Sequence, residues 1–241
     1  TTVIYTLSLH DALPISKIFQ DYLKFHSIKF KPAELNDLEV FVNHLRACTP
    51  SPEIFDKYFI GYTIPQISKE FDLLRIDNVS IVNIEIKREA TSKQIKEQLE
   101  KNFYYLGFLK KSTYHFTYIV EERKLYKLDH SQIIDCSFEE LNSRLSSQQN
   151  CETGDINRFF NPSNYLISPF NSTQDFIDNK YFLTVHQENI KKEIRKQFNT
   201  SPHSFFAITG GAGTGKTLIT YDIAKDRKST RLNSSHGKLT R

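Results

Sequence analysis

Residues 210–217, with the sequence GGAGTGKT, constrain the fold more than any other stretch of this chain. They match the pattern G-x-x-x-x-G-K-[S/T] at every fixed position. The flanks also fit, since 205–209 (FFAIT) read as a short buried strand and 218–224 (LITYDIA) as a helix. Glycines allow positive φ and close backbone approach, so amides at the amino end of that helix can face phosphate oxygens. The stretch predicts a phosphate-binding loop.

In such a loop each residue has an expected role in binding ATP. Lys216 is expected to contact the β and γ phosphates, and the Thr217 hydroxyl to hold Mg²⁺. The alternative is a glycine-rich turn that merely matches the pattern. The predicted nucleotide-binding residues are Gly210, Gly211, Ala212, Gly213, Thr214, Gly215, Lys216 and Thr217.

Both ends of the chain resemble translated sequencing adapters. Residues 226–236 match one adapter, and residues 1–15 match another with a single departure, Val3 in place of Glu. We therefore expect residues 1–16 and 226–241 not to be native, and the chain to be a gene fragment. The net charge of +4 comes mainly from the last segment, so it is weak evidence for nucleic-acid binding.

Composition excludes some classes of protein. No apolar run approaches the ~20 residues that span a bilayer, and no signal peptide is visible. Cys48, Cys136 and Cys151 include no C-x-x-C pair, which argues against a disulfide framework or a zinc site. We expect a cytoplasmic protein without a membrane or disulfide partner.

Helical and strand patterns alternate before the loop. Residues 92–108 predict a helix with Ile95, Leu99, Phe103 and Leu106 on one face. The order helix, hairpin, helix, hairpin predicts an α+β fold with a small mixed sheet and flanking helices. The other expected elements are helices in 17–47, 137–145 and 187–198, hairpins of 71–76 with 81–87 and of 115–120 with 124–128, and a linker over 146–180.

The first hairpin carries a second group of chemical interest. Because the side-chain period of a strand is two, Glu85 and Lys87 share a face, and the partner strand can place Asp72 opposite them. Crowded carboxylates repel unless a cation neutralises them, and hard oxygen ligands suit Mg²⁺ or Mn²⁺. The alternative is a solvated hairpin face with a Glu–Lys pair that contributes little.

At these residues the chain resembles the PD-(D/E)xK nuclease superfamily, with its restriction-endonuclease-like fold, and most of all the nuclease-related domains of bacterial helicases. The resemblance covers about residues 30–130, and the Pro of the family name is absent before Asp72. It implies that Asp72 and Glu85 bind metal and that Lys87 is catalytic. It also implies an assisting glutamine, Gln98 or alternatively Gln94.

An acid from the first helix belongs to many members of this superfamily. Glu34 and Glu39 are the two candidates, and the sequence does not separate them.

Upstream of the loop, residues 182–190 (FLTVHQENI) resemble the Q motif of superfamily 1 helicases. The resemblance implies that Gln187 reads the adenine edge of ATP, for which a carboxamide offers a donor beside an acceptor. The alternative is an ordinary glutamine at a helix start. The whole arrangement resembles bacterial ATPases with a Schlafen-type helicase domain.

The combined prediction is part of a helicase-like ATPase with a metal-dependent nuclease-like domain, binding DNA or RNA. We expect the nuclease-like domain at 17–145, the linker at 146–180 and the start of the ATPase domain at 181–225. A Walker B acid and a second motor lobe are missing, so the chain should bind nucleotide weakly and not hydrolyse it. The alternatives are an inactive nucleic-acid-binding module and a non-helicase P-loop switch.

Overall fold

The computed structural model describes residues 8–9, 17–25, 28, 31–49, 51–65, 67, 69–130, 132–161, 165, 169–178, 181–200, 204–211 and 213–236. The chain divides into two compact units. One comprises residues 1–64 and 69–161, and the other comprises residues 65–68 and 162–241. The boundary after residue 161 lies inside the stretch that the sequence predicts as a linker.

The first unit is built on a mixed sheet. In its described part six strands lie in the order β1-β2-β3-β4-β5-β6, with β3 and β4 parallel and all other neighbours antiparallel. Mixed strands and flanking helices confirm the predicted α+β fold class. The strands are β1 (Phe59–Ile64), β2 (Lys69–Ile76), β3 (Ser80–Lys87), β4 (Ser112–Ile119), β5 (Lys124–Asp129) and β6 (Gln132–Cys136). The helices are α1 (Lys17–Phe25), α2 (Pro32–Cys48), α3 (Ser92–Gly107) and α4 (Phe138–Ser146), with the 3-10 turns η1 (Pro52–Phe55) and η2 (Ile156–Phe159).

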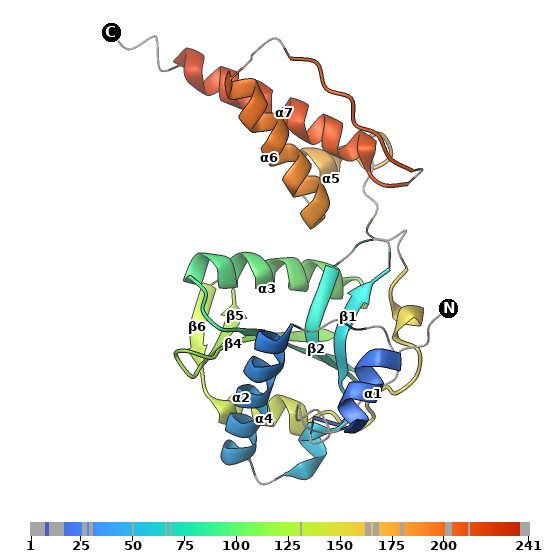
Figure 1. The fold of residues 1–241 in the computed structure, drawn as a ribbon, viewed down its shortest axis with the longest axis vertical. Helices are drawn as coiled ribbons and strands as arrows, with labels where there is room; N and C mark the ends of the chain where they lie inside the picture. Colours follow the sequence, from blue (N-terminus) through green and yellow to red (C-terminus); the bar gives the residue numbers. More distant parts are fainter. Residues whose placement is uncertain are drawn as a thin grey trace. The chain divides into compact units, whose positions relative to one another are not determined.

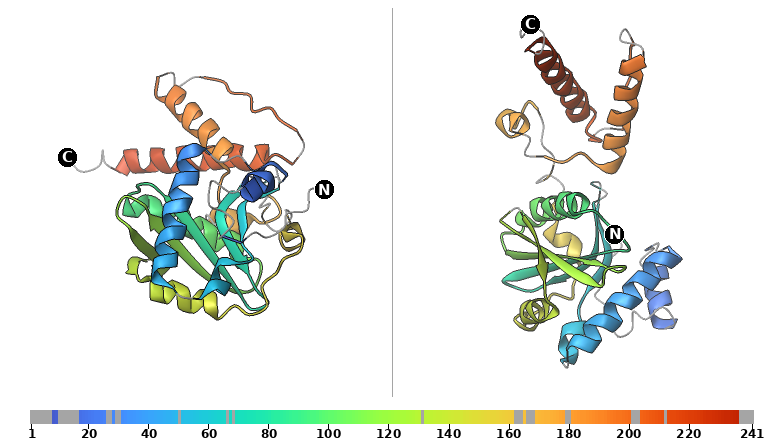
Figure 2. Two further views of the ribbon diagram at one scale, coloured as in Figure 1. Left: turned by 60° about the horizontal axis from the view of Figure 1, so that its bottom comes forward. Right: turned by 90° about the vertical axis from the view of Figure 1, so that its left-hand side faces the viewer.

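Helices cover both faces of this sheet (Figures 1 and 2). On one face α1, α2 and α4 enclose the main core, which includes Leu73, Ile84 and Phe116 of the central strands. On the other face α3 packs Ile95 and Leu99 against Ile119 of β4. Because β3 is covered on both sides, its first six residues are buried and only its last two reach water.

Helix α3 is the crossover between the parallel strands β3 and β4. Thr91 caps its amino end: the Gln94 amide donates to Thr91 Oγ1 at 3.3 Å, and the Thr91 amide donates to Gln94 Oε1 at 2.8 Å. This reciprocal pair is a capping box. It holds the Gln94 side chain at the helix start, and the following turns of α3 run toward the end of β3.

The buried face of α3 lacks one of the four residues predicted on it and includes Asn102 and Tyr105, which were not predicted. Phe103 was expected on the apolar stripe but is 57% exposed, whereas Asn102 is 0% exposed. The prediction at Phe103 was therefore wrong. The reason is a buried carboxylate beneath the helix, which requires a polar side chain at position 102.

Residues 146–161, predicted as the start of a linker, pack on the first unit. The Gln148 amide group donates to the carbonyl oxygens of Arg75 and Ser80 at 3.2 and 3.3 Å. Ile156 and Phe160 are buried. These residues therefore belong to the first unit, because their polar and apolar groups both find partners on the sheet.

The second unit contains α5 (Thr173–Ile177), α6 (Val185–Thr200) and α7 (Lys216–His236). Ile194 of α6 packs against Ile219 and Ile223 of α7. The strand expected at 205–209 is absent: residues 204–211 form neither helix nor strand, and Phe205 is fully exposed. No strand is described in this unit to pair with them, and a strand needs such a neighbour to satisfy its backbone.

The structure packs parts of both segments that are predicted not to be native. Leu9 is buried in the first core and its amide donates to the Phe55 carbonyl at 2.6 Å. Asp226 lies in α7, with an oxygen 2.7 Å from Lys191 Nζ and 3.0 Å from the Arg195 guanidinium. Packing does not report the origin of a segment, so the adapter assignment stays a prediction.

Across the described ranges, no helix is long and apolar enough to cross a membrane. Cys48, Cys136 and Cys151 are free thiols. Burial raises the pKa of all three, most of all that of Cys136, to about 12. None is therefore a thiolate at neutral pH.

Candidate metal and phosphate sites

The sheet opens between β2 and β3, and the opening creates the first candidate site. Backbone pairing runs from Ile76 opposite Ile81 to Leu73 opposite Ile84. Past this last pair, the side chain of Asp72 takes the place of a strand carbonyl: its Oδ2 accepts a hydrogen bond from the main-chain amide of Ile86 at 2.8 Å. The last residues of β3 therefore pair only with β4 and leave room on the β2 side.

Asp72, Glu85 and Lys87 lie together at this opening. Lys87 Nζ is 3.4 Å from Asp72 Oδ2 and 3.7 Å from Glu85 Oε2. The ammonium thus touches both carboxylates, as a shared counter-ion would.

Glu85 is held from the opposite side by helix α3. Gln98 Nε2 donates to Glu85 Oε2 at 3.0 Å, and Asn102 Nδ2 donates to Oε1 at 2.7 Å. The carboxylate is 1% exposed. Of the two candidate glutamines, Gln98 contacts the site and Gln94 does not, because Gln94 is used in the cap. Asn102 was missed, although its spacing of four from Gln98 puts both on one helix face.

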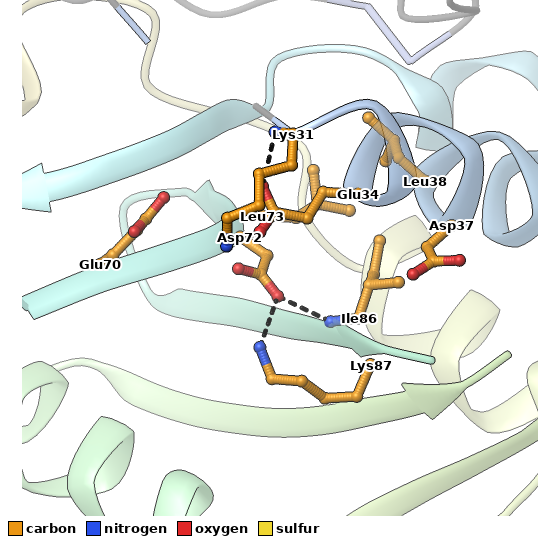
Figure 3. A pocket seen from close by; sticks show the side chains of 9 residues that line it. All are labelled: Lys31, Glu34, Asp37, Leu38, Glu70, Asp72, Leu73, Ile86 and Lys87. Atoms are coloured by element: carbon orange, nitrogen blue, oxygen red, sulfur yellow. Dashed lines mark hydrogen bonds and ion pairs between the residues drawn. The ribbon is translucent and has the colours of Figure 1, made fainter. Parts of the chain in front are cut away.

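A cavity of about 260 Å³ adjoins this group and is lined by Asp72 and Lys87 but not by the buried Glu85 (Figure 3). The Asp72 carboxylate points to Lys87 and to the Ile86 amide, and Glu70 extends away from them. Glu34 lines the cavity and Glu39 does not, which favours Glu34 as the first-helix acid. The lining residues are Lys31, Glu34, Asp37, Leu38, Glu70, Asp72, Leu73, Ile86 and Lys87.

Burial and charge crowding perturb the acids of the cavity. Burial and the neighbouring Glu85 raise the pKa of Asp72 to about 7. Burial, together with Glu34 and Glu85, also raises the pKa of Glu70. Burial opposes the charge of Lys87, but Asp72 and Glu85 outweigh it and raise the Lys87 pKa. At neutral pH the lysine is therefore an ammonium, and one positive charge does not fully satisfy the acids around it.

Replacing Asp72 with asparagine is expected to stabilise the metal-free protein at pH 8. The folded state holds the Asp72 proton more tightly than the unfolded chain, since the pKa rises from 3.8 to about 7. The free energy of unfolding therefore falls as the pH rises from about 4 to about 7. Three pKa units correspond to roughly 4 kcal/mol. With a quarter of the side chain exposed to water, we expect about half of this, or a melting temperature higher by about 5 °C.

Thermal melts in EDTA at pH 8 and pH 4 measure this effect. The increase in melting temperature caused by Asp72→Asn should become smaller toward pH 4, where the wild-type carboxyl is already protonated. Asp135→Asn, on exposed strand β6, is the matched control and should change little at either pH. A loss of stability at pH 8 would contradict the charge balance described for the cavity.

A divalent cation fits the donor set formed by Asp72 and Glu85. In the described part of the chain, no group of three or more His, Cys, Asp or Glu side chains is arranged to hold a metal. Mg²⁺, however, is usually held by one or two carboxylates, with water and substrate phosphate completing its shell. The Lys87 ammonium already lies between two such carboxylates, so the space accepts a cation once this exposed side chain moves aside.

The second candidate site is the glycine-rich loop of the second unit. Gly213 and Gly215 have φ of +75° and +78°, a conformation that favours glycine. Helix α7 begins at Lys216, so its amino end faces the loop. Lys216 Nζ donates to the carbonyls of Gly210 and Gly211 at 3.0 and 2.6 Å. Ala212 lies outside the described residues.

The other predicted nucleotide contacts are placed as follows. Thr217 is exposed in the first turn of α7, and Thr214 Oγ1 donates to the Gly211 carbonyl at 2.9 Å. Gln187 Nε2 donates to the Thr214 carbonyl at 3.0 Å, while Gln187 Oε1 accepts the Thr184 amide at 2.9 Å. Both ends of the Gln187 carboxamide are thus bonded within the chain, and its contact with adenine stays a prediction.

Comparison of the chain with family models, with curated proteins and with solved structures found no match. The functional argument therefore rests on the residues, their geometry and the chemistry of the two sites.

Proposed function

We propose that the first unit hydrolyses phosphodiester bonds of DNA or RNA with a Mg²⁺ or Mn²⁺ ion bound by Asp72 and Glu85. The observation that carries the proposal is the contact of both carboxylates with one ammonium, at 3.4 and 3.7 Å, beside an open cavity. The resemblance of these residues to PD-(D/E)xK nucleases assigns them the same roles.

A cation held there supplies a bound water of lowered pKa and positive charge for the phosphate that is cleaved. The side chains of the unit position and balance the charges. Lys87 is an ammonium at neutral pH, so it donates hydrogen bonds to a phosphate oxygen and does not accept a proton. Gln98 keeps Glu85 turned toward Lys87.

Cleavage of labelled duplex DNA, single-stranded DNA and single-stranded RNA tests this proposal directly. The whole chain should cleave at least one of them in Mg²⁺ or Mn²⁺ and stop when EDTA is added. The double variant Asp72→Asn, Glu85→Gln is the control for a contaminating nuclease. Equal cleavage by wild type and double variant refutes the proposal. Binding without cleavage favours the alternative, an inactive nucleic-acid-binding module.

For the second unit we propose weak binding of Mg²⁺-ATP without turnover, as part of a helicase-like ATPase. Two positive-φ glycines directly precede the amino end of α7, and the backbone amides of such a loop suit a phosphate. Lys216, now bonded to two loop carbonyls, would exchange them for phosphate oxygens. ATP hydrolysis that depends on Lys216 would overturn the second half of this proposal.

Gly215→Ala is expected to weaken ATP binding by about tenfold or more. Alanine at φ +78° is strained, and its Cβ would overlap the Gln187 amide. Strain of about 1–3 kcal/mol corresponds to roughly one to two powers of ten in affinity. Competition against a fluorescent ATP analogue measures the change. Gly154→Ala, where an added Cβ meets only the Arg158 side chain at 3.9 Å, should bind as wild type does. Equal affinities for the Gly215 variant and wild type would contradict the loop's role.

A further inference from the structure

Helix α3 fixes both oxygens of Glu85, but the two oxygens face different surroundings. Oε2 receives Gln98 at 3.0 Å and lies 3.7 Å from the exposed ammonium of Lys87. Oε1 accepts a hydrogen bond from Asn102 Nδ2 at 2.7 Å, and Asn102 is 0% exposed. Each oxygen therefore accepts one amide donor, but Oε2 faces Lys87 and Oε1 faces the interior beside Asn102.

The Asn102 side chain is oriented by Glu85, its one hydrogen-bond partner among the described residues. An ionised carboxylate only accepts hydrogen bonds, so the Asn102 NH₂ group must face it. The other amide atom, Asn102 Oδ1, is buried without a partner. A buried unpartnered acceptor costs about 1–3 kcal/mol. The position nevertheless carries an amide, because the buried Glu85 carboxylate needs a donor on this side.

Neighbouring positions on the sheet are also polar and buried. Asn83 and His115 are paired across β3 and β4, as are Glu85 and Thr117. The side-chain polar atoms of Asn83, His115 and Thr117 have no hydrogen-bond partner among the residues that the structure describes. Burial lowers the pKa of His115 to about 4, so this ring is neutral. The interior behind Glu85 therefore supplies no cation to compete for Oε1, and Asn102 is its only donor in the described structure.

Resting on the metal-dependent activity proposed above, we propose that Asn102 is a positioning residue that sets the metal preference of the site. By holding Oε1 in the interior it leaves only Oε2, which faces Lys87, to offer to a cation in the place of the ammonium. One-oxygen coordination suits Mg²⁺ and Mn²⁺, which take about six ligands with several waters. Ca²⁺ takes about six to eight oxygens and often binds both oxygens of one carboxylate. Asn102 therefore disfavours Ca²⁺.

The test compares Mn²⁺ and Ca²⁺ binding by the full chain. Free Mn²⁺ is read from its electron paramagnetic resonance signal, and Ca²⁺ is added as competitor. The variants are Asn102→Leu, which keeps the branching at Cγ without the donor, and Asn102→Ala, which is smaller and avoids overlap. Glu97→Leu, on the exposed side of α3, is the control. Circular dichroism melts show which proteins are folded.

Substitution of a residue that hydrogen-bonds to a metal ligand typically changes metal affinity by about 10–100-fold. We expect both Asn102 variants to lower the ratio of Mn²⁺ to Ca²⁺ affinity by about tenfold, with Glu97→Leu unchanged. A ratio that stays constant, whether or not both affinities fall together, overturns the role of Asn102 and leaves the proposed activity standing. A wild-type chain that binds no Mn²⁺ overturns both.

Discussion

Lys87→Ala should lower the rate of metal-dependent cleavage by at least about a hundredfold. The ammonium is the one cation that touches both Asp72 and Glu85, at 3.4 and 3.7 Å, among the residues that the structure describes. It is charged at neutral pH, and in the proposed reaction it lies where negative charge develops on the cleaved phosphate. Removing one well-placed donor to such a charge typically slows a reaction about 10²–10³-fold. Single-turnover cleavage of a labelled strand measures the loss.

Two controls separate this effect from damage to the fold. Lys93→Ala removes an exposed lysine from α3, 85% accessible, and should cleave at the wild-type rate. Lys87→Arg keeps the charge with a different geometry and should recover part of the activity. Full cleavage by Lys87→Ala would show that the chemistry lies elsewhere.

Arg75→Met is expected to lower the free energy of unfolding by about 3 kcal/mol, the largest stability change that we predict. The Arg75 side chain is 4% exposed and donates to the carbonyls of Glu53, Asp56 and Leu145, at 2.6 to 3.0 Å. It thereby joins β2 to η1 and to the end of α4. Methionine fills similar space but removes these three hydrogen bonds of the guanidinium, and a hydrogen bond that involves a charged group contributes about 1.5–3 kcal/mol.

Urea unfolding measures this loss as a lower midpoint with an unchanged slope. Arg123→Met, at an exposed turn between β4 and β5, is the matched control and should stay within about 0.5 kcal/mol of wild type. If Arg75→Met were as stable as wild type, the hydrogen bonds of Arg75 would not be holding these segments together.

The site on the first hairpin could be predicted because its signals are local. The alternation of residues 81–87 places Glu85 and Lys87 on one face of β3. The turn at Asp77, whose Oδ1 accepts the amides of Val79 and Ser80 at 2.8 and 2.6 Å, fixes the register. Register then brings Asp72 opposite Glu85.

The edge strands β1 and β6 could not be predicted, because neither has an alternating pattern. Five of the six residues of β1 are buried, and β6 has only five residues, mostly exposed. The parallel pairing of β3 with β4 was also out of reach, since it depends on the α3 crossover and not on a turn.

Asn102 shows why a hydrophobic stripe is an incomplete guide to burial. Apolar spacing selected Phe103, but the requirement of a buried carboxylate selected Asn102. The carboxylate belongs to a strand, so the sequence of the helix alone does not reveal this requirement. Residues 205–209 do not form the expected strand for a related reason, because strand formation depends on a neighbouring strand.

The dependence of cleavage rate on Mg²⁺ concentration tests the central claim most directly. The account predicts no cleavage without metal, a saturable rise with Mg²⁺, an immediate stop on adding EDTA, and a much higher Mg²⁺ requirement for Glu85→Gln. Cleavage that persists in EDTA, or that has the same Mg²⁺ dependence in wild type and Glu85→Gln, would contradict it.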